Sequence, residues 1–224
     1  MREKLTLLEG FNRINAIVNQ PLENLLNENQ FDLIIKNKGK AGTLLEELIN
    51  LEPVSHTMDF VDGELKTNFV NENGIAKEPL AITQVGGWIK DIIEGLFFED
   101  SKVFKKIKKF LYVPLVRLPK NEYKKWKFLP PILFDKDNRE QQTIYNCLCD
   151  DYKDIQKQAV CCFKQKLKFH TFNGDWNYLQ IRTKDSMPYT PIILDGFEFS
   201  NKQRAFYIKA NFFKKLNESK IGVS

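Results

Sequence analysis

The feature that most constrains the fold is the order in which helical and strand-like spacings of apolar residues follow one another along the chain. Helical spacing covers about 5–27, 43–52, 87–97, 101–110 and 138–166. Strands are expected at 75–85, 111–118 and 177–184, the last with clear alternation. A hairpin or two short strands are expected at 58–70, and a loop, strand and terminal helix at 195–216. Pro130 and Pro131 exclude a helix from the extended stretch 123–134. Because the elements follow no regular β-α-β rhythm, the sequence predicts a mixed α/β fold.

The size and charge of the chain limit the classes of protein it can belong to. Its 224 residues suffice for one large domain or two small ones, and its formal charge of +5 permits nucleic-acid binding without being diagnostic. No apolar run is long enough to span a bilayer, and the first twenty residues lack the apolar centre of a signal peptide. We therefore expect a soluble, cytoplasmic protein without a membrane partner. The cysteines at 147, 149, 161 and 162 fit no usual zinc pattern and are expected to be free buried thiols.

The stretch MDFVDGELKTNF, residues 58–69, places carboxylates and a lysine among apolar residues. Because alternate residues of a strand point to the same face, Glu64 and Lys66 should project together while Leu65 faces the core. Asp59, on a preceding strand or turn, can lie alongside them. Two carboxylates and an ammonium suit a divalent metal with a phosphate beside it, the D-(x)n-(D/E)-x-K arrangement of many nucleases. Taken alone the motif is common, and a solvated strand with an ion pair is the alternative interpretation.

The segment before it, KGKAGTLLEELI, predicts a glycine-containing turn that opens a helix near Thr43. Glycines at 39 and 42 permit a close approach of the backbone to a ligand. The helix could carry a further acid to the carboxylates. Its apolar stripe lies nearer to Glu47 than to Glu46, so the helical pattern alone selects Glu47.

Several blocks of the chain resemble the MutH family, which comprises mismatch-repair endonucleases and related type II restriction enzymes that recognise GATC. The pattern K-G-x-x-G-x-x-L-E stands at 38–46, followed by Asp59 and by E-L-K at 64–66. Further blocks are KKIKKFLYVPL at 105–115, YLQIRTK at 178–184 and KQRAFYIKANF at 202–212. The resemblance implies a restriction-endonuclease-like PD-(D/E)xK nuclease, in which a mixed central sheet is flanked by helices and two lobes surround a DNA cleft. It implies one domain over 1–224, with a catalytic lobe near 1–115 and a recognition lobe near 116–224.

The same resemblance implies roles residue by residue. Asp59, Glu64 and Lys66 would be catalytic, with Asp59 and Glu64 holding Mg²⁺, or Mn²⁺ in its place. Glu46 would be an additional acid near the metal, so the resemblance favours it over Glu47. Residues expected to contact DNA are Lys38, Lys106, Arg182, Thr183, Lys184, Arg204, Tyr207 and Lys209. Arginine suits guanine O6 and N7, and Tyr207 would lie near the adenine that Dam-type methylases modify.

The chain departs from the family at two points. Only four residues separate Asp59 from Glu64, so Asp62 is a substitute if the register shifts, and Thr183 stands where MutH itself carries proline. The expected function is Mg²⁺-dependent hydrolysis of double-stranded DNA at GATC by a type II restriction endonuclease, with a second copy of the chain for double-strand cleavage. Two alternatives stay open. One is a MutH-type nickase that acts on unmethylated strands under a MutL-type activator, and the other is a GATC-binding module without catalysis.

Overall fold

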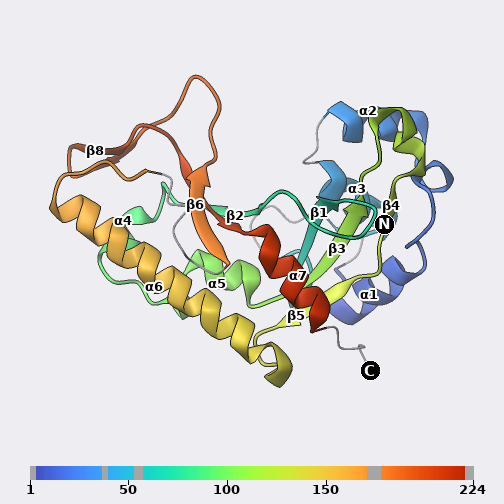
Figure 1. The fold of residues 1–224 in the computed structure, drawn as a ribbon, viewed down its shortest axis with the longest axis horizontal. Coiled ribbons are helices and arrows are strands. Elements are labelled where there is room, and N and C mark those ends of the chain that lie inside the picture. The colour runs from blue at the N-terminus through green and yellow to red at the C-terminus, as the bar shows by residue number, and fades with distance from the viewer. Residues whose placement is uncertain (1–3, 37–39, 53–57, 171–177, 220–224) are drawn as a thin grey trace. The chain divides into compact units, whose positions relative to one another are not determined.

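The computed structural model describes residues 4–36, 40–52, 58–170 and 178–219, which fold into two compact units that alternate along the chain (Figure 1). Unit 1 combines Met1–Glu78, Lys108–Arg139 and Phe213–Ser224, and unit 2 combines Pro79–Ile107 and Glu140–Phe212. Each unit therefore contains segments from before and after residue 115, where the lobe boundary is expected. One domain over 1–224 and a DNA cleft between two lobes stay predictions.

Unit 1 contains a four-stranded mixed sheet. β1 (Glu64–Val70) lies parallel to β3 (Lys109–Val116), and β4 (Lys127–Phe128) and β5 (Ile132–Asp135) pair with β3 in the antiparallel sense. All of β3 after Lys109 is buried, which explains its nearly continuous apolar sequence. The sheet therefore places the E-L-K segment on β1, directly beside a buried central strand.

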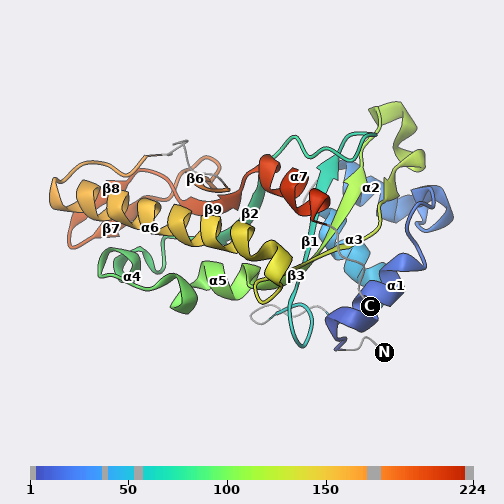
Figure 2. The ribbon, with the colours of Figure 1, turned by 60° about the horizontal axis from the view of Figure 1, so that its bottom comes forward.

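Helices cover both faces of this sheet (Figure 2). Leu44 of α3 (Lys40–Leu48) packs in one apolar cluster with Leu65 of β1. On the other face, Phe213 of α7 (Ala210–Glu218) stacks on Tyr112 of β3, with the ring centroids 4.2 Å apart. The remaining helical elements of unit 1 are α1 (Leu7–Asn15), α2 (Glu28–Lys36) and the 3₁₀ turns Leu22–Asn24 and Lys120–Lys125. The predicted α/β class, with a mixed sheet flanked by helices, is confirmed.

The N-terminal helix is shorter than the sequence predicts. α1 begins at a capping box, in which Thr6 and Glu9 accept hydrogen bonds from each other's backbone N–H groups. It ends at Asn15, and the positive φ of Asn19 (61°) and the ring of Pro21 prevent its continuation. The expected helix over 5–27 is therefore correct only in its first half, and the next α-helix begins at Glu28.

The lysine-rich segment 105–109 is divided between a helix and a strand. α5 (Lys102–Ile107) ends there, and β3 begins at Lys109. The Nζ of Lys109 lies 3.6 Å from Asp62 Oδ2 and 3.4 Å from Asp135 Oδ2. The expected single helix over 101–110 is wrong, because the apolar run that follows Lys109 enters the sheet. The segment 58–70 likewise forms a bend and one strand rather than a hairpin.

Unit 2 contains a three-stranded antiparallel sheet in the order β2 (Leu80–Gln84), β9 (Arg204–Ile208) and β6 (Leu179–Thr183). A hairpin of β7 (Ile192–Leu194) and β8 (Phe197–Ser200) follows β6. The other elements are α4 (Ile89–Ile93) and the 3₁₀ turns Phe98–Asp100 and Arg139–Gln141.

The long helix α6 (Gln142–Lys164) confirms the helix predicted over 138–166 and packs on β6 (Figure 1). Its buried Asp151 accepts hydrogen bonds from the N–H groups of Tyr178 and Leu179, at 2.6 and 2.8 Å. A carboxylate on the helix thus anchors the first residues of β6, the strand on which the predicted base-reading residues lie.

The four cysteines are free thiols, as predicted, but only Cys162 is buried, and Cys161 is exposed. Burial raises the pKa of the Cys162 thiol, which keeps it protonated at neutral pH and favours a packing role over a nucleophilic one. Within the described ranges, no helix combines the length and the apolar character needed to cross a membrane.

Candidate active site and nucleic-acid interface

Three charged side chains singled out in the sequence lie together at the start of β1. The Nζ of Lys66 donates to Glu64 Oε2 at 2.5 Å and lies 3.8 Å from Asp59 Oδ2. Glu64 is only 1% exposed, whereas Asp59 and Lys66 are partly accessible. One ammonium therefore faces both carboxylates and offsets the cost of burying Glu64.

Local backbone geometry brings Asp59 to this position. Glu64 and Lys66 alternate with Leu65, whose side chain is buried in the apolar cluster. The N–H of Leu65 donates to Asp59 Oδ2 at 2.8 Å, and the N–H of Phe60 donates to the carbonyl oxygen of Gly63 at 2.9 Å. A gap of four residues is therefore long enough to place Asp59 beside the E-L-K segment.

Gly63 makes this short connection possible. A Cβ at Gly63 would lie 2.5 Å from Leu7 Cδ1 and 2.8 Å from the backbone oxygen of Lys109. A backbone oxygen inside a sheet cannot rotate away, so a side chain at Gly63 would push β1 away from β3. Nothing in the sequence marks this requirement, because both neighbours are distant from Gly63 along the chain.

We expect Gly63→Ala to lower the free energy of unfolding by about 2 kcal/mol, because overpacking against fixed neighbours costs roughly 1–3 kcal/mol. Urea denaturation followed by tryptophan fluorescence measures the change. Gly87→Ala is the matched control, since nothing lies within 4 Å of a Cβ at that position. Equal losses in the two variants would contradict the steric role of Gly63.

Asp62, the alternative first acid, has other partners. Its Oδ1 accepts a hydrogen bond from the N–H of Leu7 at 2.8 Å, at the start of α1. Its Oδ2 lies 3.6 Å from the Nζ of Lys109. Asp59, and not Asp62, therefore shares Lys66 with Glu64 in this arrangement.

α3 presents Glu46 and Glu47 to different neighbours. Glu47 Oε2 accepts a hydrogen bond from Gln30 Nε2 of α2 at 3.4 Å. Glu46 follows Gly42 by one turn, and residues four apart share a helix face. A Cβ at Gly42 would lie 3.5 Å from Cγ2 of Thr67 on β1, so this face of α3 is turned toward β1. The role of Glu46, rather than Glu47, as the additional acid stays a prediction.

Asp59 and Glu64 are the candidate ligands for a metal ion. Among the residues that the structure describes, no group of three or more His, Cys, Asp or Glu side chains is arranged to hold one. Mg²⁺ typically takes one or two protein carboxylates and completes its octahedron with waters and substrate phosphate oxygens. Asp59 and Glu64, which already face one cationic group, fit such an ion.

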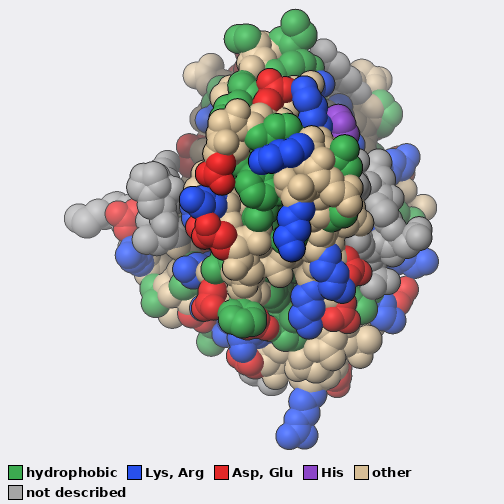
Figure 3. Space-filling model, turned by 90° about the vertical axis from the view of Figure 1, so that its left-hand side faces the viewer, with side chains coloured by type: hydrophobic (Ala, Val, Ile, Leu, Met, Phe, Trp, Pro, Cys, Tyr) green, Lys and Arg blue, Asp and Glu red, His purple; other side chains and the backbone are tan. Residues whose placement is uncertain are grey.

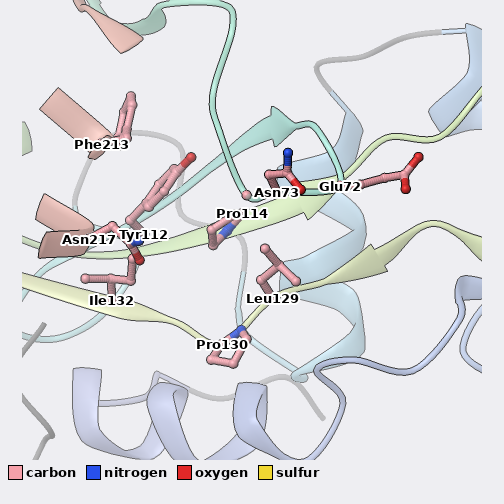
Figure 4. Close-up of a pocket in the computed structure, with 10 residues that line it drawn as sticks. Glu72, Asn73, Tyr112, Pro114, Leu129, Pro130, Ile132, Phe213 and Asn217 are labelled. Carbon is pink, nitrogen blue, oxygen red and sulfur yellow. The ribbon is translucent and has the colours of Figure 1, made fainter. Parts of the chain in front are cut away.

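Unit 1 also contains a pocket of about 340 Å³ (Figure 4). Tyr112 lines it and is the cross-strand partner of Lys66, so the two side chains share a sheet face. The other lining residues are Glu72, Asn73, Gly74, Pro114, Leu129, Pro130, Ile132, Phe213 and Asn217. Burial raises the pKa of Tyr112, and its hydroxyl has no hydrogen-bond partner within the described part of the chain.

We expect Tyr112→Phe to leave the free energy of unfolding unchanged or to raise it by up to about 1 kcal/mol, because the substitution removes an unsatisfied buried hydroxyl. Denaturant titration measures the difference. Tyr152→Phe is the comparison, since the Tyr152 hydroxyl donates to the carbonyl oxygen of Leu96 at 3.2 Å. That variant should lose about 1 kcal/mol. A similar loss in Tyr112→Phe would mean that the Tyr112 hydroxyl is bonded in solution.

In unit 2, three predicted DNA-contacting residues lie on one face of the sheet. Arg182 and Lys184 are exposed, and the charged group of each lies 5.9 Å from the centroid of the Tyr207 ring on β9. Burial raises the pKa of Tyr207, so its phenol stays neutral at pH 7. The result is a basic surface built around an aromatic ring, which suits contact with phosphates and bases.

Thr183 and Arg204 lie on the opposite face, as partners across β6 and β9. Arg204 donates from Nη1 to Thr183 Oγ1 at 2.8 Å and from Nε to Ser200 Oγ at 2.9 Å. Arg204 is 3% exposed, and burial lowers the pKa of its guanidinium. Arg204 therefore joins the ends of β6 and β8, and any influence on DNA would pass through these partners.

The structure does not bring the remaining predicted residues together. Lys209 follows β9, and its N–H donates to the carbonyl oxygen of Tyr178 at 2.7 Å. Lys106 is partly exposed on α5 in unit 2. Lys38 lies outside the described residues. The DNA roles of these three lysines stay predictions.

Comparisons with known proteins address the first of these sites. Residues 54–146 match the family model described as DNA mismatch repair enzyme MutH, a range that contains Asp59, Glu64, Lys66 and Lys106. A solved structure described as "Restriction endonuclease MvaI-cognate DNA substrate complex" is 14% identical, with 99% of this chain and 98% of that chain covered and a TM-score of 0.44. No curated protein matches the chain. The family match confirms that the chain resembles the MutH family over residues 54–146, and it supports a DNA endonuclease.

Proposed function

We propose that the protein is a Mg²⁺-dependent endonuclease that hydrolyses phosphodiester bonds of double-stranded DNA at GATC, as a type II restriction enzyme. The observation that carries this proposal is the convergence of Asp59 and Glu64 on Lys66 at the start of β1. An ammonium between two carboxylates beside a buried strand suits a metal-dependent phosphodiester-cleaving site.

In this mechanism Asp59 and Glu64 hold the metal, and Glu46 supports the metal or a nearby water. Mg²⁺, or Mn²⁺, polarises the phosphate when bound and lowers the pKa of a water. Lys66 orients the attacking water and offsets the negative charge that develops on the phosphate. Products would carry 5′-phosphate and 3′-hydroxyl ends.

DNA would be held by positively charged and polar side chains of both units. Lys38 and Lys106 would bind near the scissile phosphate. Arg182, Lys184 and Tyr207 would supply base contacts, with Thr183, Arg204 and Lys209 around them. Because one chain has one such site, double-strand cleavage needs a second copy of the chain or two sequential nicks.

A MutH-type nicking enzyme is the second candidate. The match of residues 54–146 to a family described as a mismatch repair enzyme favours it. Such an enzyme would act on unmethylated strands at GATC under a MutL-type activator. Either enzyme would work in the cytoplasm.

Cleavage of a plasmid with GATC sites, unmethylated or Dam-methylated, in Mg²⁺ and then in EDTA tests the proposal. Metal-dependent linear fragments with ends at GATC would support the restriction enzyme. Open circles alone would support the nickase. Tight duplex binding without any cutting would overturn both and leave a non-catalytic GATC-binding module.

A further inference from the structure

The loop that follows β6 exposes a continuous apolar tip. We name residues 184–191, KDSMPYTP, the β6–β7 loop. Met187 is 79% exposed, and Pro188, Tyr189 and Pro191 are exposed as well. Figure 1 shows the loop extending beyond the end of β6. Single exposed apolar residues are ordinary, but four within five positions at one loop tip require an explanation.

Hydrogen bonds hold this loop in one shape. The carboxylate of Asp185 accepts from the N–H groups of Thr190 at 2.6 Å, Ser186 at 3.0 Å and Gln203 at 3.3 Å. The N–H of Lys184 also donates to the carbonyl oxygen of Gln203, at 3.0 Å. The Asp185 pKa is lowered chiefly by the bond from Thr190, so its carboxylate stays ionised at neutral pH. The exposed tip is therefore supported by a rigid base.

Three basic side chains border the tip. Lys184 is exposed where the loop begins, and Arg182 precedes it on β6. The Nζ of Lys202 lies 4.0 Å from the centroid of the Tyr189 ring. Figure 3 shows lysine and arginine side chains among apolar and acidic ones on the side of the molecule that faces the viewer. An apolar tip with a basic border matches a polyanion whose interior is apolar, namely stacked bases between phosphate backbones.

We propose that the β6–β7 loop is an apolar wedge that enters a groove of duplex DNA, with Met187 packing against or between base pairs. Lys184 and Lys202 contact the flanking phosphates, and Asp185 is a positioning residue that keeps the tip in its inserted shape. Side chains such as methionine and proline unstack base steps when they enter a groove in this way. This inference rests on the proposed function, because it requires the duplex to lie at the Arg182 and Lys184 surface.

The test uses the full-length protein in EDTA, so that cleavage does not interfere, and a GATC duplex with 2-aminopurine at successive positions. Wild-type protein should raise the fluorescence at one step, which reports unstacking. Met187→Ala should abolish the rise and weaken binding about tenfold, the order expected from burying a methionine side chain. Phe97→Ala is the matched control, because Phe97 is 73% exposed in the same unit but lies near Glu99 and Asp100.

Asp185→Ala separates the tip from its support. It should weaken binding and reduce the fluorescence rise although Met187 is retained, and amide hydrogen exchange of residues 186–190 should become faster. Fluorescence and affinity of Met187→Ala equal to those of the wild type would overturn the wedge. Unchanged DNA binding together with loss of self-association would overturn it in favour of a contact between copies. Wild-type protein that binds no duplex would overturn the proposed function as well, so the two failures are distinguishable.

Discussion

Lys66→Ala is expected to reduce Mg²⁺-dependent cleavage of GATC-containing DNA by about 10³-fold, because a positioned group that acts on the nucleophile or on developing charge is worth about that factor. Duplex affinity in EDTA should change by less than about threefold, since phosphate and base contacts elsewhere set it. Single-turnover cleavage and a filter-binding titration measure the two effects.

Loss of the ammonium also removes the cationic group that donates to the buried Glu64. We therefore expect the variant to unfold more easily, by about 3 kcal/mol, and its thermal melting must lie above the assay temperature. Lys109→Ala is the matched control, since Lys109 pairs with Asp62 and Asp135 instead. Cleavage by Lys66→Ala at the rate of Lys109→Ala would exclude Lys66 from catalysis.

Asp59→Asn and Asp62→Asn should differ strongly although the two residues lie three positions apart. Asp59→Asn should lower cleavage by at least about 100-fold, because a metal site supplies several kcal/mol and each 1.4 kcal/mol is about tenfold in rate. Asp62→Asn should stay within about threefold of the wild type, because its oxygen can still accept from the N–H of Leu7.

Cleavage rates measured over a range of Mg²⁺ concentrations provide the comparison. Asp59→Asn should need more Mg²⁺ for half-maximal rate, whereas Asp62→Asn should not. The reverse result would mean that the acid at Asp62 serves the metal and that the bend between residues 59 and 63 has a different register in the active protein.

The parts of the fold and site that depend on local pattern could be predicted from sequence. Alternation around Leu65 placed Glu64 and Lys66 on one strand face, and the structure has them there. The long apolar stripe of 138–166 likewise predicted α6. In these segments burial on one face and backbone propensity favour the same element, so neighbouring residues suffice to define it.

Features that depend on distant neighbours could not be predicted in this way. A side chain at position 63 would collide with Leu7 and Lys109, which lie near Gly63 only in the folded chain. The sequence around Arg204 is typical of a surface arginine at the end of a strand. In the structure Arg204 is buried and donates hydrogen bonds to Ser200 and Thr183. The role of Asp185 could not be predicted either. Its carboxylate accepts hydrogen bonds from backbone N–H groups, and no side-chain motif reveals those.

The alternation of the two units along the chain has a consequence for synthesis on the ribosome. The sheet of unit 1 cannot close until β5 has emerged, and the sheet of unit 2 waits for β9, near the end of the chain. Trp88 and Phe98, which are buried in the finished protein, are thus exposed while more than half of the chain is still to be made. The sheet of unit 2 therefore forms only after β9 has left the ribosome, and nascent chains should depend on chaperones during that interval.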